Sequence, residues 1–525
     1  GNGVAGRTIS HDLGTTVGML VVKSTSHATS WKVQHRSTGA TNALELDDTR
    51  GATDVSTAFW NDTAASSTHF TVGTDSGVNT SGRTYVAYLF AHNNNDGEFG
   101  PDGDQDIIKC GSYVGNTSTK PVIDLGFEPQ WLMIKSSTAG TTDDAWYIVD
   151  NMRSFEALPL HDDGSQFLRA NATDAESGAG QFQRVASNST GFSLGSGTGW
   201  NAAGQTYIYM AIRRGPLAPP EAGTEVFEVF ETTNTGTAST IGSMGPSDFI
   251  LNKRTDAAAT WRTLDRLRGG SMLRTDSTDS ETSASNFLEW DKMGGVFVTA
   301  QGAPYITNDE QAHWSWKRAP SYFDVVAYTG TNSAMTLSHN LAAVPEMMWV
   351  KTRPTADDWA VYHSALGNTK TLFLNATNAS STKIYWNNTT PTDTQFYLGD
   401  HSKVSAANEY IAYLFASLAG VSKVGSYTGS NSVAVEVDCG FTSGARFVLI
   451  KRTDAVGTSG NWYVYDSVRG IVSGADDPYL LLNTSDAEAS NTNNIEPLSS
   501  GFKLTIQGNN PISVNGGSYV FYAIA

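Results

Sequence analysis

Two stretches of the chain place a carboxylate beside a cation in the same pattern. Residues 145–154 read AWYIVDNMRS and residues 461–470 read NWYVYDSVRG, so Asp150 and Asp466 each follow a Trp by four positions and precede an Arg by three. A carboxylate held next to a guanidinium is a common element of acid–base sites. The pattern therefore raises the hypothesis of a catalytic pair, with a structural pair as the alternative.

A group of acidic residues has the composition of a calcium site. Its members are Glu98, Asp102, Asp104 and Asp106. Alternating carboxylates supply the hard oxygen ligands that Ca²⁺ prefers. The spacing departs from an EF-hand loop, because Ile107 and Tyr113 stand where that loop needs its turn Gly and its bidentate Glu. The two readings are a calcium site, which would be the only cofactor expected, and a solvated acidic linker.

One serine matches a hydrolase motif. Ser193 lies in GFSLG, the pattern G-x-S-x-G, which must stand between a strand and a helix to expose a nucleophile. The related stretch GFKLT puts Lys503 at the same place, and no helical pattern follows either copy. The histidines are scattered without zinc-ligand spacing. We therefore expect no catalytic residue and no enzymatic activity.

The charge of the chain restricts its partners. Asp and Glu number 52 against 34 Lys and Arg, a formal net charge of −18, which would repel nucleic acid and anionic membranes. No apolar run approaches the roughly 20 residues that span a bilayer, so we expect no membrane insertion. Cys110 and Cys439 fall at different points of the repeat described next, which predicts two free thiols.

The carboxylate pattern recurs because the chain is repetitive. Five copies carry an apolar run that ends in Lys, then a Trp 8 or 11 residues later, then Asp or His four residues after the Trp. These signature residues are Trp31, Trp146 with Asp150, Trp261 with Asp265, Trp359, and Trp462 with Asp466; His35 and His363 replace Asp in two copies. A position that recurs in every copy serves the module itself. We therefore expect Trp in the core and Asp or His bracing a turn.

Each copy spans about 100 residues and consists of short β-branched and aromatic runs between Gly, Asn, Asp and Ser turns. The predicted fold class is all-β, a tandem array of about five β-sandwich, jelly-roll-like modules. The predicted segments are module A at 1–92, an acidic linker at 93–105, module B at 106–215, a Pro-rich linker at 216–223, a divergent module C at 224–318, module A′ at 319–419 and module B′ at 420–525.

The joins between copies suggest how the modules follow one another. Short connections between modules C, A′ and B′ predict that these three stack as a rod. Module A′ opens with FDVVAYTG, whereas module A begins at GNGVAGRTISHDL without an equivalent strand. This difference predicts that the native polypeptide continues upstream of Gly1.

Several long phrases resemble a known family. WSWKRAPSYFDVVAYTGT, HNLAAVPEMMWVK, YIAYLFASLAGVSKVGSYTG and NWYVYDSVRGI resemble a repeat family of tail-fibre and other tail-associated proteins of marine bacteriophages. The resemblance implies a virion structural protein that is assembled in the host cytoplasm and mediates host attachment without catalysis. It also implies other virion proteins and a host-surface glycan or protein as partners, and a homo-oligomer, with a trimer favoured.

Two other functions stay open at this point. A glycan-degrading tailspike would need a groove with two opposed carboxylates. A structural spacer or capsid decoration protein would need no ligand.

Overall fold

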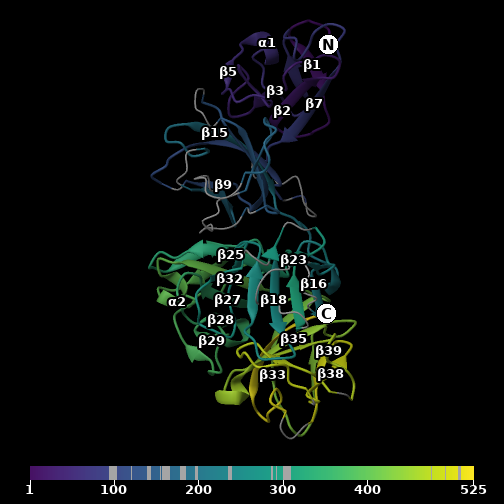
Figure 1. Ribbon diagram of the computed structural model, residues 1–525, viewed down its shortest axis with the longest axis vertical. Helices are drawn as coiled ribbons and strands as arrows, with labels where there is room; N and C mark the ends of the chain where they lie inside the picture. The colour runs from purple at the N-terminus through teal and green to yellow at the C-terminus, as the bar shows by residue number, and fades with distance from the viewer. Residues whose placement is uncertain are drawn as a thin grey trace. The chain divides into compact units, whose positions relative to one another are not determined.

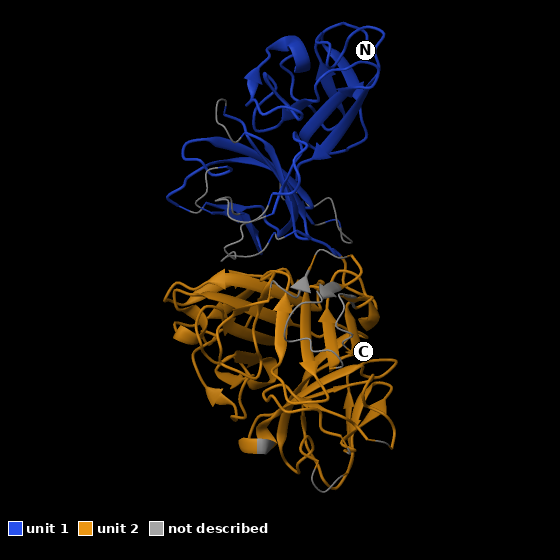
Figure 2. Ribbon diagram, in the orientation of Figure 1, with its two compact units in different colours: residues 1–217 blue, residues 218–525 orange. Residues whose placement is uncertain are grey.

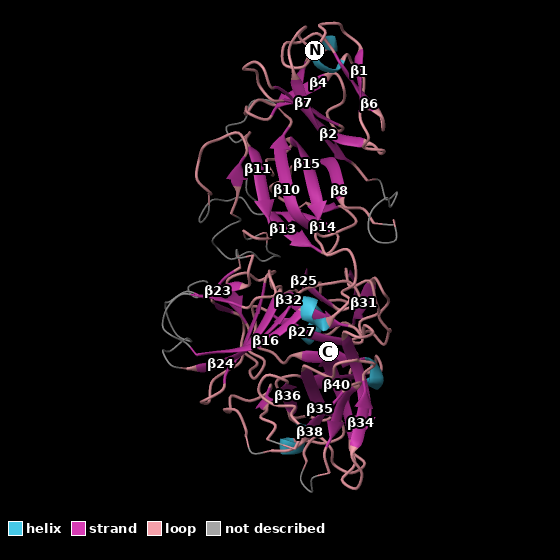
Figure 3. Ribbon diagram, turned by 90° about the vertical axis from the view of Figure 1, so that its right-hand side faces the viewer, coloured by secondary structure: helices cyan, strands magenta, loops and turns pink. Residues whose placement is uncertain are grey.

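In the computed structural model, regular secondary structure is almost all antiparallel β-sheet, with 41% of residues in strands and 4% in helices. Figure 3 shows this composition. The predicted all-β, multi-module fold class is confirmed. The structure describes residues 1–93, 103, 105–119, 121–138, 144–153, 155, 166–177, 185–195, 199–233, 239–284, 288–290, 293–298, 309–474, 476–490, 492–506 and 510–525.

The chain divides into two compact units. Unit 1 is Gly1–Leu217 and unit 2 is Ala218–Ala525 (Figure 2). Unit 1 contains the strands of modules A and B, and unit 2 contains those of modules C, A′ and B′.

Module A has a five-stranded sheet in the order β5-β4-β3-β2-β7 and a two-stranded sheet β1-β6 (Figure 1). Its elements are β1 (Arg7–Ser10), β2 (Val17–Ser24), β3 (Lys32–His35), β4 (Asn42–Glu45), β5 (Thr53–Asp54), α1 (Thr57–Trp60), β6 (His69–Val72) and β7 (Tyr85–Ala91).

Module B has sheets β12-β11-β10-β15-β8 and β13-β14-β9. Its elements are β8 (Ile108–Val114), β9 (Val122–Asp124), β10 (Pro129–Ser136), β11 (Trp146–Asp150), β12 (Leu168–Arg169), β13 (Val185–Asn188), β14 (Gly191–Leu194) and β15 (Thr206–Arg213).

Module C, which follows η1 (Gly223–Glu225), has sheets β16-β24-β18-β19, β17-β23-β22 and β20-β21. Its strands are β16 (Phe227–Thr233), β17 (Ser239–Ile241), β18 (Phe249–Arg254), β19 (Arg262–Asp265), β20 (Ser271–Met272), β21 (Thr282–Ser283), β22 (Leu288–Glu289), β23 (Val296–Val298) and β24 (Glu310–Trp316).

Module A′ has sheets β25-β32-β27-β28-β29-β30 and β26-β31. Its elements are β25 (Phe323–Thr329), β26 (Met335–Ser338), β27 (Met347–Thr352), β28 (Ala360–His363), η2 (Ser364–Leu366), β29 (Lys370–Phe373), β30 (Ser381–Thr382), β31 (Gln395–Leu398), α2 (Ser402–Ser405) and β32 (Glu409–Phe415).

Module B′ has sheets β33-β40-β35-β36-β37 and β34-β39-β38. Its elements are β33 (Ser422–Thr428), β34 (Val435–Asp438), β35 (Phe447–Arg452), η3 (Gly457–Gly460), β36 (Trp462–Asp466), β37 (Leu480–Leu481), β38 (Ile495–Leu498), β39 (Gly501–Leu504) and β40 (Ser518–Ile524).

Four modules share one plan for the middle of the large sheet. The last strand of the module lies between the first strand and the strand that ends in the recurring Lys, as in β25-β32-β27 and β33-β40-β35. In module A the last strand, β7, pairs with β2 on one side and has no described strand on its other side. The sheet of module A therefore ends at β7.

The central strands are apolar on both faces because both faces are covered. In β35, Val448 and Ile450 belong to the core of module B′, whereas the ring of Phe447 lies 5.5 Å from Phe227 of module C. Continuous apolar runs are typical of strands buried on both faces, as the run FVLIK indicates. Within the described part of the chain, no helix has the length and apolar character needed to cross a membrane.

The burial pattern predicts that unit 1 is less stable than unit 2. Tyr88 in β7 is 47% exposed, whereas its counterpart Tyr413 in β32 is 0% exposed. Unit 1 thus leaves apolar sheet surface in water that unit 2 buries. We expect calorimetry to show two transitions, and hydrogen exchange to show residues 1–217 losing protection first. Simultaneous loss of protection in both units would contradict this prediction.

Candidate functional site: joints between modules

Three signature tryptophans connect the modules of unit 2 in a closed cycle. Each indole N–H donates a hydrogen bond to a backbone carbonyl of another module, at 2.8–2.9 Å: Trp261 to Leu481, Trp359 to Arg274, and Trp462 to Phe373. Module C is thus bonded to B′, module A′ to C, and module B′ to A′. The expectation that these modules stack as a rod is wrong, because each contacts both of the others.

The recurring lysines of unit 2 bond to the same neighbouring modules as the signature tryptophans do. Lys253 Nζ lies 3.5 Å from the Thr484 carbonyl oxygen, and Lys351 Nζ lies 3.2 Å from that of Thr278. Lys451 Nζ likewise lies 3.5 Å from a carbonyl oxygen of module A′. Burial lowers the pKa of Lys253 and Lys351 to about 8 and that of Lys451 to about 7. Each ammonium group is therefore largely withdrawn from water and is held by carbonyls of two modules.

The signature aspartates first organise their own turn. Asp466 accepts hydrogen bonds from the backbone N–H groups of Val468 and Arg469, at 3.1 and 3.0 Å, and forms an ion pair with the Arg469 guanidinium. Asp265 is paired in the same way with Arg268. An aspartate that accepts backbone N–H groups two and three residues ahead fixes a turn locally.

The same aspartates also receive a donor from a neighbouring module. The Tyr413 hydroxyl of module A′ donates to Asp265 Oδ2 at 2.6 Å, and the Trp314 indole of module C donates to Asp466 Oδ2 at 3.1 Å. Asp265 and Asp466 are both 0% exposed. Fully enclosed and bonded on several sides, these carboxylates are arranged as joints between modules, with no open face for a substrate.

In module A′, His363 stands at the position that Asp265 and Asp466 hold in modules C and B′. The Nε2 atom of His363 donates to the Phe521 carbonyl of module B′ at 3.4 Å, and its Nδ1 accepts from the Ala365 backbone at 3.2 Å. Burial lowers the pKa of His363 to about 4, so the ring is neutral at pH 7. A neutral imidazole supplies the donor and the acceptor that this joint uses.

Unit 1 contains the corresponding joint between modules A and B. The Trp146 indole donates to the Glu45 carbonyl at 2.9 Å, and Lys135 Nζ donates to the Thr49 carbonyl at 2.9 Å. His35 lies with Nε2 3.1 Å from the Tyr209 carbonyl oxygen. The Trp and His bonds match those between A′ and B′ residue by residue, and the Lys bond differs by one position, since Lys451 bonds to Ala376.

The remaining signature residues of unit 1 lie at a surface. Trp31 is half-buried and stacks on Tyr88, with ring centroids 6.1 Å apart. Asp150 and Arg153 form the ion pair that the sequence suggested, yet their side chains are 20% and 22% exposed. Their counterparts Asp466 and Arg469 are 0% and 2% exposed. The difference arises because unit 1 has no third module in its described residues.

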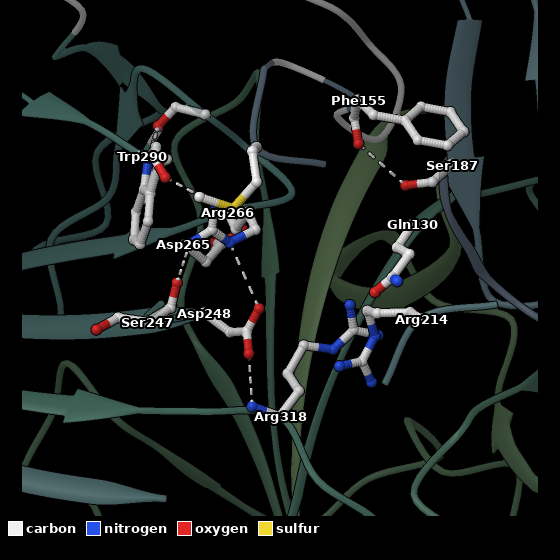
Figure 4. Close-up of polar contacts among 12 residues, drawn as sticks. Gln130, Phe155, Ser187, Arg214, Ser247, Asp248, Asp265, Arg266, Trp290 and Arg318 are labelled. Carbon is white, nitrogen blue, oxygen red and sulfur yellow. Dashed lines mark hydrogen bonds and ion pairs between the residues drawn. The ribbon is translucent and has the colours of Figure 1, made fainter. Parts of the chain in front are cut away.

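A polar cluster that sequence reasoning missed joins module C to the start of module A′. Asp248 Oδ2 accepts the Arg318 backbone N–H at 2.7 Å, and its Oδ1 lies 3.6 Å from Arg266 Nε (Figure 4). The Arg318 side chain donates to Asp324 Oδ1 at 2.8 Å. In module B′ the position equivalent to Asp248 is occupied by Arg446. The residue type at this position does not recur, so the repeat pattern gave no signal of the cluster.

Three of the four predicted calcium ligands have no described structure, so the calcium site stays a prediction. Glu98, Asp102 and Asp104 lie outside the described residues. Asp106 is buried, and its backbone carbonyl accepts a hydrogen bond from Arg213 at 3.3 Å. Among the described residues, no group of three His, Cys, Asp or Glu side chains is placed to hold a metal ion.

The other chemical candidates lie within strands or cores. Ser193 lies in β14, paired with Ala186 on one side and Val122 on the other. A strand interior does not present a serine as a nucleophile elbow does. Cys110 and Cys439 are buried free thiols.

A matched pair of substitutions tests the joint that Tyr413 makes. Tyr413→Phe removes the hydroxyl bonded to Asp265, so unit 2 should lose about 1–3 kcal/mol of unfolding free energy. Tyr88→Phe changes the exposed counterpart and should alter unit 1 by less than about 0.5 kcal/mol. Urea unfolding followed separately for each unit gives both values. Equal losses would show that Tyr413 makes no special contact.

The buried histidine predicts acid sensitivity. Because the folded pKa of His363 is near 4 and the unfolded value near 6.5, its contribution to stability is complete above pH 6.5 and is lost as the pH falls to 4. His363→Asn should reduce the pH dependence of unit 2 unfolding by about 3 kcal/mol over this range. His27→Asn, at an exposed position, is the control. An unchanged pH profile in His363→Asn would contradict the assignment.

Comparison with known proteins agrees with the division into two units. The model of a family described as "Domain of unknown function (DUF7483)" matches residues 1–216 and 222–525. A search of curated proteins finds no match. Because the family model covers almost the whole sequence, the chain belongs to the DUF7483 family.

Proposed function

We propose that this protein is a virion structural protein, a bacteriophage tail fibre or tail-associated appendage that mediates attachment to the host surface without catalysis. The observation that carries the proposal is the use of the recurring ionisable residues. Asp265 and Asp466 are enclosed in joints between modules, and the recurring lysines of modules B, C, A′ and B′ bond to carbonyls across the same joints. Recurring charged residues that bond neighbouring modules together favour a mechanical role for the protein.

The cyclic arrangement of unit 2 supports the same role. Three modules that each bond to both of the others form a block that resists bending more than a chain of modules joined end to end. An appendage exposed to solvent and mechanical load benefits from such cross-bonding. The acidic charge of −18 also favours a soluble, exposed particle protein over a nucleic-acid-binding one.

Particle labelling and adsorption test the proposal. Gold-labelled antibody against the chain should mark appendages of the intact phage particle. The purified protein should bind host cells and reduce phage adsorption at least several-fold, through multiple weak contacts. Particles that carry no label would contradict a virion role.

A degradation assay separates attachment from catalysis. Host polysaccharide incubated with the purified protein should keep its chain length. Release of oligosaccharide would contradict the non-catalytic role and would favour a glycan-degrading tailspike.

A further inference from the structure

Three modules share a stacked tyrosine pair between their first and last strands. The pairs are Tyr113 on Tyr207 at 5.2 Å, Tyr328 on Tyr410 at 5.0 Å and Tyr427 on Tyr519 at 4.9 Å between ring centroids. In each pair the first-strand tyrosine donates its hydroxyl to a backbone carbonyl, that of Trp200, Val404 or Ile512. The first strand thus closes the sandwich beside the last strand and fills its core.

Module A has one half of this arrangement. Tyr85 at the start of β7 is the counterpart of Tyr410, and no described tyrosine stacks on it. A cavity of about 210 Å³ lies there, lined by Ile9, Phe70, Val72 and Val78 together with Tyr85, and by the polar side chains of Arg7 and Asn79. The edge of β7 beside this cavity is unpaired in the described structure. An open strand edge next to a cavity with both apolar and polar lining is a docking place for another strand.

The outer face of β7 is only partly covered, because Trp31 and Phe90 pack against a cluster shared with module B while Tyr88 stays exposed. Tyr88 is 47% exposed, and Trp31 and Phe90 are half-buried. Their counterparts in module A′ are 0% exposed: Tyr413, Trp359 and Phe415. The two modules share the same residue types at these positions, so the difference lies in what covers them.

In unit 2, one continuous segment covers both the outer face and the edge of β32, the strand equivalent to β7. Module C covers the outer face, where Phe249 lies 4.6 Å from the Tyr413 ring and Asp265 accepts the Tyr413 hydroxyl. The chain then runs directly into β25, which pairs with β32 along seven residues and places Tyr328 on Tyr410. The segment 224–329 therefore supplies the module and the strand together.

We propose that unit 1 is an acceptor for a β-module of the type of module C. The trailing strand of that module would pair with β7 and place a tyrosine on Tyr85. Its Asp–Arg turn would bind the Tyr88 hydroxyl in the way that unit 2 binds that of Tyr413, which donates to Asp265 and accepts a hydrogen bond from Arg268. The occupant is thus defined by an apolar, aromatic strand and a buried carboxylate, and its binding completes a cycle of three modules like that of unit 2.

A peptide tests the strand site on the full chain. The peptide SYFDVVAYTG, which has the sequence of residues 321–330, should bind saturably and raise the melting temperature of unit 1 and not of unit 2, whose edge is already occupied by β25. The peptide with Tyr328→Ala should bind at least tenfold more weakly. The peptide with Tyr328→Phe keeps the stacked ring and should lose less affinity. Absence of binding, or equal binding of all three peptides, would overturn the strand assignment.

A labelling experiment tests the outer face independently. In a Y88C variant of the full chain, the introduced thiol should react rapidly with a maleimide, because Tyr88 is exposed. Adding a second copy of residues 222–330 before Gly1 should slow this reaction at least tenfold. The same extension with Val326→Asp and Tyr328→Asp in the added copy is the control and should give less protection.

Two outcomes of the labelling experiment would overturn the proposal. The first is equal labelling with and without the added module. The second is protection that rises with protein concentration in the unextended Y88C chain, which would identify a second copy of the chain as the occupant.

Discussion

The structure of unit 2 depends on burying both faces of the large sheet in each of its modules. One face packs on the small sheet of its own module, and the other packs on neighbouring modules, as the aromatic contacts of Phe447 with Phe227 and Trp316 show. Buried polar groups at these contacts must find partners there, since an unsatisfied buried donor costs about 1–3 kcal/mol. In unit 2 the Trp, Lys and Asp or His of each repeat meet this demand by bonding across the joint. The signature is therefore a device for joining modules.

Cyclic closure explains why the same residue behaves differently in the two units. Within unit 2 every module has two neighbours, so the ion pair of Asp466 and Arg469 is enclosed. In unit 1 the equivalent pair of Asp150 and Arg153 has one neighbouring module and stays partly exposed. An ion pair removed from water contributes to specificity more than to stability, because its desolvation offsets much of its attraction. In unit 2 these pairs also accept a donor from a neighbouring module, Tyr413 at Asp265 and Trp314 at Asp466.

Much of the fold could be predicted from the sequence, because repetition and β-type composition are local signals. The recurring Trp and Lys were visible as a period, and the turn-forming role of Asp466 follows from its short-range bonds to Val468 and Arg469. The joints were not predictable, because Trp462 donates to a backbone carbonyl 89 residues away, and a carbonyl has no side-chain signal. For the same reason the short connections between modules suggested a rod, whereas the chain closes a cycle.

In unit 2 the signature carboxylate joins modules, because Asp265 and Asp466 each accept a hydrogen bond from another module. A double-mutant cycle on unit 2 tests this role most directly, with Asp466→Asn, Trp314→Phe and the combined variant compared by urea unfolding. Because Trp314 donates to Asp466 across modules, we predict a coupling energy of about 1–2 kcal/mol between residues 152 positions apart. Additive effects within about 0.3 kcal/mol would contradict the account.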